Sequence, residues 1–406
     1  MKSIWIFTGC LVLLFIQAGC SMFSGHRKAG WQSPYRAFSS LKEGDIVHLP
    51  TGVSVTKDQL IEILTGARLI YVGEAHDNIN CHKVQLEILE ALEKRYPGKV
   101  AVGMEMLQRS SQNVADQWTY GELDEKEFMR TWVEDWSNDF RYYRAILQYV
   151  RDQKIPLLAL RASDDWVESI KNTDPAQEEK ENEESLPEMD IEDSYHRSHI
   201  KAVFGKHPGR NQSFEEFYKV QVLWDESMAE SIVLYLLSEE GRDRRVVVFA
   251  GRQHVEHGFG IPRRAFRRLP LPYAIVLPVS VGVAPEKKHK LMNITLPEVP
   301  LLPGDFAWMV SYEDLEDERV YLGVMIRHTE DGVKIFAISK NSTAGKAGLQ
   351  KEDVITAFDG EIIETEFDLT YLIGLKKPGD KGIVDVLRDE EPLRFEVTFE
   401  AGGFHM

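Results

Sequence analysis

Two stretches with a common pattern decide the fold. Residues 67–72 read Ala-Arg-Leu-Ile-Tyr-Val and precede Gly73-Glu74-Ala75-His76, and residues 246–250 read Val-Val-Val-Phe-Ala and precede Gly251-Arg252-Gln253-His254. Short apolar runs without alternation, ended by glycine, predict parallel strands that are buried on both faces. The loops after such strands open at the carboxyl edge of the sheet, where open α/β sheets place their ligands. Both G-x-x-H loops are therefore expected at one site, which holds a metal, a haem or a substrate.

Strand-like and helix-like segments alternate from residue 55 to residue 280. Further strands are expected at 100–104, 155–160 and 273–277, and helices at 80–96 and 214–237. This alternation predicts an α/β domain with a mainly parallel sheet flanked by helices. A Pro-rich stretch at 281–317 predicts a linker. Short strands and a helix at 367–375 then predict a small β-rich domain at 318–400.

Charge and the first residues restrict the partners and the location. The net charge is −17 and no Lys/Arg-rich stripe occurs, which argues against nucleic acid as a partner. An apolar run, Ile4–Ile16, precedes Ala18-Gly19-Cys20 and resembles a bacterial lipobox, although Gln17 departs from the pattern. We therefore expect a signal peptide at 1–19, a lipid on Cys20 and a tether at 20–54 leading into the fold. Ser21 after the Cys indicates an outer-membrane lipoprotein facing the periplasm.

Polar side chains gather at the ends of the predicted strands, namely Glu74, His76, Glu105, Arg161, Arg252 and His254. Two imidazoles with one or two carboxylates can bind a divalent metal and leave a position open for water. The expected ligands are His76, His254 and Glu105, and the expected catalytic set is Glu74, His76, Glu105 and His254, with one Glu as general base. The alternative is a structural cluster in which Glu105 pairs with Arg161.

A second group of candidates follows an acidic stretch at 174–193. Tyr195, His196 and His199 lie in a helix-like segment, and His196 and His199 share helical spacing. Because Tyr and His can ligate haem iron, these three residues are candidate haem ligands. The alternative is an ordinary polar helix start beside an acidic loop.

Four motifs in residues 55–280 resemble the ChaN-like family of the Tiki/TraB/erythromycin-esterase superfamily. They are Tyr71-Val72-Gly73-Glu74-Ala75-His76-Asp77, Gly103-Met104-Glu105-Met106, Gln221-Val222-Leu223-Trp224-Asp225-Glu226-Ser227-Met228-Ala229, and Ala250–His254 continuing to Gly260-Ile261-Pro262. The resemblance implies lipoproteins that bind haem in iron uptake and form dimers around it. It also implies relatives that are metal-dependent peptidases or esterases, with His76, His254 and Glu105 in the matching positions. Arg161, Asp225, Glu226 and Arg252 are expected to support the site.

The C-terminal region resembles a PDZ domain of the bacterial protease-associated kind. Tyr321-Leu322-Gly323-Val324 matches the carboxylate-binding loop. Residues 342–355 match the family's S-P-A-x-x-A-G-L-x-x-G-D-x-I stretch, with Thr343 in place of the usual Pro and Glu352 in place of the usual Gly. The resemblance implies that a protein or peptide C-terminus binds at Leu322, Gly323, Val324, Phe367 and Tyr371 as an added strand. The alternative is a PDZ fold used only for packing.

Two functions follow from these patterns. The first is a membrane-anchored haem or iron-uptake lipoprotein whose PDZ domain recruits a partner. The second is a metal-dependent hydrolase of peptide or ester bonds, with the PDZ domain presenting the substrate. Family resemblance favours the first function.

Overall fold

The computed structural model describes residues 40–136, 138–171, 186–204, 213–282, 301–315 and 319–400. The predicted signal peptide and Cys20 lie outside the described residues, as do residues 172–185 of the acidic stretch and 283–300 of the predicted linker. Across the described ranges, no helix combines the length and apolar character needed to cross a membrane.

The first domain is built on an eight-stranded sheet with the order β2-β1-β8-β7-β3-β6-β4-β5. The strands are β1 (Ile46–His48), β2 (Val53–Val55), β3 (Leu69–Glu74), β4 (Val100–Gln108), β5 (Leu157–Arg161), β6 (Arg245–Gly251), β7 (Tyr273–Val281) and β8 (Phe306–Ser311). All neighbours from β8 to β5 are parallel, and β1 and β2 add antiparallel strands at one edge. The predicted mainly parallel sheet is thus confirmed.

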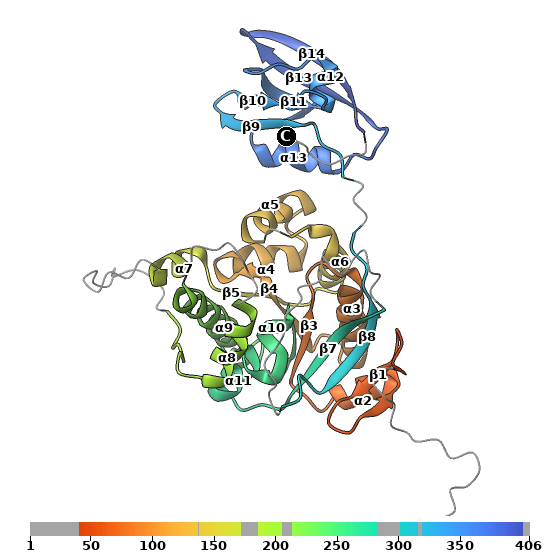
Figure 1. The fold of residues 1–406 in the computed structure, drawn as a ribbon, viewed down its shortest axis with the longest axis vertical. Coiled ribbons are helices and arrows are strands. Elements are labelled where there is room, and N and C mark those ends of the chain that lie inside the picture. Colours follow the sequence, from red (N-terminus) through yellow and green to blue (C-terminus); the bar gives the residue numbers. More distant parts are fainter. Residues whose placement is uncertain are drawn as a thin grey trace, which may run out of the picture.

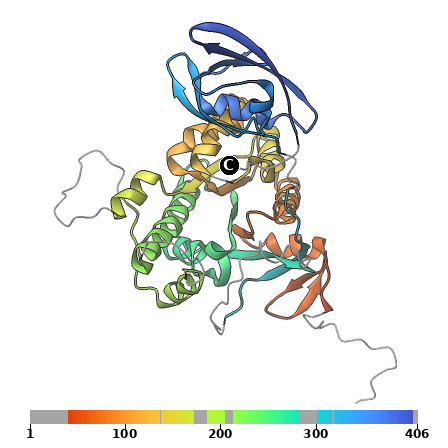
Figure 2. The same ribbon diagram turned by 45° about the horizontal axis from the view of Figure 1, so that its top comes forward.

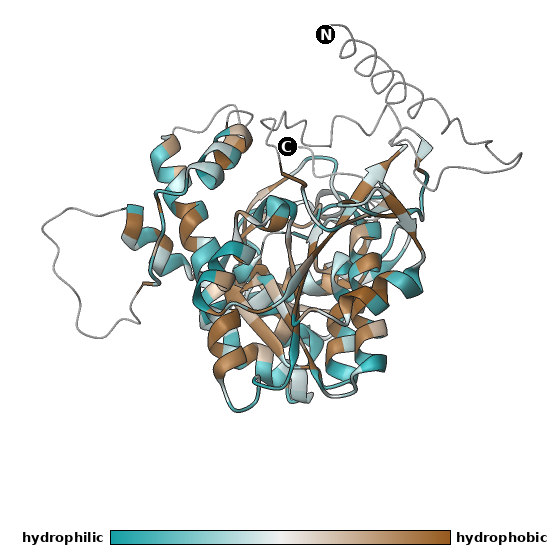
Figure 3. Cartoon of the chain, turned by 90° about the horizontal axis from the view of Figure 1, so that it is seen from below, coloured by the Kyte–Doolittle hydropathy of each residue, from teal (hydrophilic) through white to brown (hydrophobic). Residues whose placement is uncertain are grey.

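Helices cover both faces of this sheet (Figures 1 and 2). One face packs against α2 (Lys57–Leu64), α3 (Ile79–Arg95), α4 (Gln112–Tyr120), α5 (Glu125–Asp135) and α6 (Arg144–Asp152), and the other against α9 (Phe214–Leu237), α10 (Arg252–Val255) and α11 (Ile261–Arg268). Two shorter elements, α7 (Asp164–Lys171) and α8 (Ser194–Phe204), pack beside α9. Figure 3 shows brown, hydrophobic strands between helices that mix brown and teal residues. Burial on both faces explains why β3 and β6 lack polar alternation.

Three local expectations differ from the structure. Strand β8 lies inside the predicted linker at 281–317, and it pairs in parallel with β7 because its residues from Phe306 to Val310 are apolar and buried. Strand β1 likewise lies inside the predicted tether at 20–54, and β2 begins there at Val53. Strand β4 also continues to Gln108, so Glu105 lies within the strand and not at its end.

The second domain is an antiparallel β-rich unit with two helices. Its elements are β9 (Val324–Thr329), β10 (Gly332–Ile338), α12 (Thr343–Ala347), β11 (Val354–Phe358), β12 (Glu361–Ile362), α13 (Glu366–Gly374), β13 (Lys381–Arg388) and β14 (Glu391–Thr398). The main strand order is β14-β13-β11-β10-β9, so β9 forms an edge of the sheet beside α13. Asp389 and Glu390 turn the β13–β14 hairpin with positive φ.

Helix α5 of the first domain meets helix α13 of the second (Figure 1). Lys126 Nζ lies 2.8 Å and Arg130 Nη2 lies 3.1 Å from Oδ1 of Asp368. Arg130 also donates to Thr365 Oγ1 and lies with its guanidinium 4.6 Å from the centre of the Phe367 ring. The contact between the domains is therefore charged and partly aromatic.

Candidate functional site

The two G-x-x-H loops meet at the carboxyl edge of the sheet, as expected. Strands β3 and β6 are parallel neighbours in which Glu74 pairs with Gly251. The Gly251 backbone N–H donates to Glu105 Oε2 at 2.6 Å, and a Cβ at Gly251 would lie 2.8 Å from His76 Nε2. Glycine at 251 is therefore what allows His76 and Glu105 to approach the same strand end.

Glu74 is the anchor of the first half of the site. This carboxylate is 3% exposed and lies with Oε1 2.6 Å from His76 Nδ1; Oε1 also accepts from the Tyr143 hydroxyl at 2.6 Å. Gln85 Nε2 donates to Oε2. Burial would raise the pKa of Glu74, but His82 and His76 together hold it below its ordinary value. Glu74 therefore acts as an ionised group that orients the His76 ring.

His76 is the accessible member of the site. Its side chain is 30% exposed, and the Trp136 ring meets it edge-on at 5.0 Å. Burial lowers the pKa of His76, whereas the hydrogen bond and charge of Glu74 raise it, and the net result is a raised pKa. With Nδ1 held by Glu74, the Nε2 atom is the one that faces Gly251 and Glu105.

His254 is the centre of the second, fully buried half. Its Nδ1 lies 2.7 Å from Asp225 Oδ1, and its Nε2 lies 3.3 Å from Glu105 Oε1. Asp225 Oδ2 in turn lies 2.9 Å from His196 Nε2, so Asp225 is shared between two imidazoles. Carboxylate and imidazole therefore alternate from Glu105 through His254 and Asp225 to His196.

Within this buried half, the charge on His254 and the charges on Glu105 and Asp225 stabilise one another. Burial would lower the pKa of His254, but Glu105 and Asp225 raise it to about 10. Burial would raise the pKa of Glu105, but His254 and His76 lower it to about 2. The pKa of Asp225 is lowered too, chiefly by His254 against the effect of burial. The buried half thus holds a cationic imidazole between two carboxylates.

The supporting residues divide between the site and its surroundings. Arg161 does not pair with Glu105, which is taken up by Gly251 and His254; Arg161 donates instead to the Asp135 carbonyl and lies 5.5 Å from the Trp136 ring centre. Arg252 pairs with Glu256.

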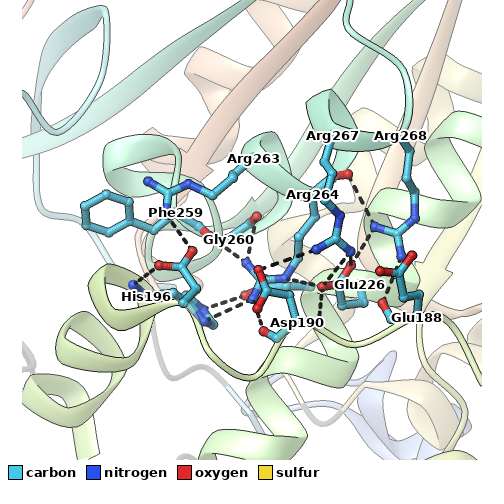
Figure 4. A network of polar contacts seen from close by, with 12 residues as sticks. Glu188, Asp190, His196, Glu226, Phe259, Gly260, Arg263, Arg264, Arg267 and Arg268 are labelled. Atoms are coloured by element: carbon cyan, nitrogen blue, oxygen red, sulfur yellow. Dashed lines mark hydrogen bonds and ion pairs between the residues drawn. The ribbon is translucent and has the colours of Figure 1, made fainter.

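Glu226 lies outside the cluster, in an arginine network shown in Figure 4. It accepts ion pairs from three residues of α11, which are Arg264, Arg267 and Arg268. Arg264 also contacts His196 Nδ1 at 3.2 Å. The Asp225-Glu226 pair on α9 therefore serves two purposes, because Asp225 faces the site and Glu226 fastens α11.

Four contributors to the site have no local sequence signal. Tyr143, Gln85, His82 and Trp136 come from α3 and from segments near α6, and only the tertiary fold brings them to Glu74 and His76. His82 and Gln85 lie among the buried residues of α3, beside Val84 and Ile88, but the sequence does not identify their partner. A buried Gln in such a position requires a partner.

The predicted divalent-metal set is only partly assembled. His76, Glu105 and His254 do converge, yet no group of three or more His, Cys, Asp or Glu in the described ranges is arranged to hold a metal ion. The short contacts of His254 with Glu105 and Asp225 occupy both of its ring nitrogens. In this arrangement the His254 imidazole is a partner of two carboxylates and has no ring nitrogen left for a metal ion.

The three haem-ligand candidates on α8 have different surroundings. Tyr195 is 51% exposed and lies beside Phe259 and Arg263. His196 is engaged by Asp225 and Arg264. His199 is 1% exposed, and neither of its ring nitrogens has a hydrogen-bond partner among the described residues. Burial lowers the pKa of His199 to about 4, so its imidazole is neutral near pH 7.

The candidate peptide site of the second domain divides in two. Leu322 is buried, Gly323 has φ +76° with Ser342 where a Cβ would stand, and Val324 begins the edge strand β9. Phe367 and Tyr371, in contrast, face the first domain, under Arg130 and near Lys126. The loop and edge strand thus retain the expected geometry, whereas the two aromatic side chains take part in the domain contact.

Fold and motifs together define an α/β domain of the haem-binding superfamily joined to a PDZ domain. The family described as "Haem-binding uptake, Tiki superfamily, ChaN" matches residues 60–265, and the PDZ family matches residues 320–399. The first match covers more than half of the chain, which therefore belongs to the ChaN family.

The chain is also similar to solved and curated proteins. The structure titled "Cofacial heme binding to ChaN of Campylobacter jejuni" is 20% identical, with a TM-score of 0.50, and covers 66% of this chain and 98% of that one. A "Putative protease Do-like 11, mitochondrial" from Arabidopsis thaliana is 31% identical over 101 residues, 22% of this chain and 18% of that protein. A "Probable periplasmic serine endoprotease DegP-like" from Ectopseudomonas mendocina is 31% identical over 112 residues, 24% of each. The chain thus spans at most about a quarter of these curated relatives.

Proposed function

We propose that the protein is a membrane-anchored, periplasm-facing haem-binding lipoprotein of iron uptake or haem handling, whose PDZ domain recruits a protein or peptide partner. Family membership supports haem as the ligand. The lipobox-like Ala18-Gly19-Cys20 supports the anchor and the outer-membrane location. The edge strand β9, with the loop at Leu322 and Gly323, supports peptide binding by strand addition. A homodimer is expected for the haem-loaded form.

The observation that carries the haem proposal is that helix α8 holds two possible iron ligands without strong partners of their own. Tyr195 and His199 are four residues apart, so they lie on the same side of the helix. Tyr195 offers an accessible phenol, and His199 offers a neutral imidazole whose two nitrogens lack partners. The phenol oxygen of Tyr195 and an imidazole nitrogen of His199 are both ligand atoms that haem iron accepts. His196 is not offered, because Asp225 and Arg264 already engage it.

The neighbouring side chains also suit a porphyrin. Phe259 lies 5.7 Å from Tyr195 between ring centres, and the Arg263 guanidinium lies 4.9 Å from the centre of the Phe259 ring. The exposed Tyr195 ring offers an aromatic surface to the macrocycle. Arg263 is paired with Asp193, so a propionate would have to replace that carboxylate as its partner. When bound, haem supplies the iron chemistry; these residues would bind and orient it.

The test is a haem titration of residues 21–406, with absorbance read in the Soret region. We expect a saturable band that is lost or strongly shifted in Tyr195→Phe or His199→Phe. Tyr120→Phe is the matched control, because Tyr120 is another exposed tyrosine, on α4. A band unchanged in both α8 variants would refute the ligand assignment. Stoichiometric divalent metal on the same sample, lost in His76→Ala, would instead favour the metal-dependent hydrolase.

A further inference from the structure

A pocket of about 300 Å³ opens at the amino edge of the parallel strands, and it is lined by Arg68, Tyr96, Lys99, Arg242, Asp243 and Arg245. Arg68 directly precedes β3, Lys99 directly precedes β4, and Arg245 begins β6. The strand-end site of Glu74, His76 and His254 lies at the opposite, carboxyl edge of the same strands. The pocket is therefore separate from that site.

Two of the four cations in this pocket are held in place by neutral groups. Arg68 Nη2 donates to the carbonyls of Arg242 at 2.9 Å and Arg244 at 2.8 Å. Arg245 donates to the Ala67 carbonyl and lies 4.1 Å over the Tyr96 ring. Backbone carbonyls and an aromatic face fix a guanidinium without cancelling its charge. Both positive charges are thus positioned but not neutralised.

The other two cations have no structural task in the described part of the chain. Lys99 and Arg242 are exposed, and their side chains make no hydrogen bond or ion pair there. Arg68 and Arg245 also have no carboxylate within 4.0 Å in the described part of the chain. Asp243 is the acidic residue of the lining, and it forms no ion pair with any of the four cations. Four cations and one carboxylate therefore line one small pocket, and no ion pair within 4.0 Å joins them in the described part of the chain.

This arrangement contrasts with the arginines elsewhere in the protein. On α11, Arg264, Arg267 and Arg268 share the carboxylate of Glu226 (Figure 4). Arg109 likewise pairs with Glu230, and Arg388 pairs with Asp353. The whole chain carries a net charge of −17, so carboxylates are plentiful. Like charges that are kept together without a counter-ion repel one another, and an anion placed between them removes that repulsion.

We propose that this amino-edge pocket binds a phosphate-bearing anion. Guanidinium groups match the oxygens of phosphate through paired N–H donors, and a lysine adds a point charge. The pocket volume accommodates a phosphate group with a small substituent. Two sources share this chemistry, a soluble phosphate ester and the headgroup of an anionic phospholipid. The proposal stands independently of haem binding on α8.

The test measures two probes with residues 21–406, which keep both domains. Inorganic phosphate is titrated calorimetrically at low salt, and sedimentation is measured with vesicles of 30% phosphatidylglycerol in phosphatidylcholine. The pocket variant combines Lys99→Gln and Arg242→Gln, two exposed positions whose replacement leaves packing intact. The control variant combines Lys219→Gln and Lys377→Gln, which removes the same charge at exposed positions elsewhere.

We expect the pocket variant to lose about tenfold or more in affinity for at least one probe, with the control close to the parent protein. Loss for phosphate alone identifies a soluble ester, and loss for vesicles identifies a lipid headgroup. Binding to the affected probe should also weaken with added salt. No binding of either probe, or equal losses in the pocket and control variants, would overturn the proposal.

Discussion

The Nδ1 atom of His254 lies 2.7 Å from Oδ1 of Asp225, and both side chains are fully buried. This contact ties α10, the short helix directly after β6, to the middle of α9. Asp225 also lies 2.9 Å from His196, so one carboxylate supports two imidazoles. We predict that Asp225→Asn, which keeps the shape but removes the charge, lowers the free energy of unfolding by about 3 kcal/mol, because it leaves a buried imidazolium short of a partner.

Chemical denaturation at pH 7 would measure this loss. Asp331→Asn is the control, because Asp331 is exposed and lies in the β9–β10 turn. We also expect the pKa of His254 to fall in the variant, as followed by NMR of its ring protons. An unfolding midpoint equal to that of the parent would show that the contact contributes nothing to stability.

The pH dependence of stability should carry the signature of His254. Its pKa in the folded protein is about 10 against an ordinary value of 6.5, so the folded state holds the proton more tightly. The stabilisation is therefore complete below pH 6.5, declines above it, and is lost as the pH rises through about 10. We expect the difference in unfolding free energy between the parent and His254→Gln to shrink between pH 7 and pH 10.

This second experiment uses the difference between two proteins because lysines and tyrosines elsewhere titrate in the same range. Those groups affect the parent and the variant alike. A difference that stays constant up to pH 10 would contradict a raised pKa for His254.

Gly251 should tolerate no side chain. A Cβ there would lie 2.8 Å from His76 Nε2 and 3.4 Å from Glu105 Oε2, so Gly251→Ala must push these groups apart. We predict a loss of about 1–3 kcal/mol in unfolding free energy and a changed NMR titration of His76. Gly374→Ala is the control, because a Cβ at Gly374 meets nothing within 4 Å. Equal unfolding free energies and an unchanged His76 titration in the two variants would show that the space beside His76 accommodates a methyl group.

The strands and their edge were predictable from the sequence because apolar runs such as Val246–Ala250 leave few alternatives to a doubly covered parallel sheet. Glu74, His76 and His254 were predictable because they follow such runs directly. The state of these groups was not, since it depends on Tyr143 and Gln85 at one carboxylate and on Asp225 at another.

The strands added beside β7, which are β8 and β1, escaped prediction for a related reason. Strand β8 follows a long Pro-rich segment, and nothing near Phe306 shows that it will pair with β7 and β1. The domain contact was equally hidden. Phe367 matches a peptide-binding position by motif, yet Arg130 of α5 covers its ring. Pairings between residues far apart in sequence leave no local pattern.

Replacing His199 by phenylalanine should make the haem-free protein more stable. Its two buried ring nitrogens lack partners, and unpaired buried polar atoms cost free energy. We predict that His199→Phe raises the free energy of unfolding by about 1 kcal/mol in the absence of haem. His196→Phe on the same helix should lower it, because that change breaks the contact with Asp225. Thermal or chemical denaturation measures both, and a destabilised His199→Phe would indicate that its nitrogens do have partners in solution.

Docking of the two domains should depend on the charges that α5 presents to Asp368. Asp368 is buried, and Lys126 together with the Thr365 cap holds its pKa well below the ordinary value against the effect of burial. Arg130 forms a second ion pair with the same carboxylate. We predict that the double variant Lys126→Ala/Arg130→Ala releases the PDZ domain, since these two residues supply the ion pairs and the cation–aromatic contacts between α5 and α13.

Small-angle X-ray scattering should then show a larger radius of gyration, and proteases should cut more rapidly between the domains. The two cations are about a third exposed and share one buried carboxylate. Each ion pair contributes about 1 kcal/mol, so the loss of both shifts a docked population substantially. Lys57→Ala is the control, because Lys57 pairs with Glu87 away from the interface. Unchanged scattering and cleavage in the double variant would mean that the apolar parts of α5 and α13 suffice to hold the domains together.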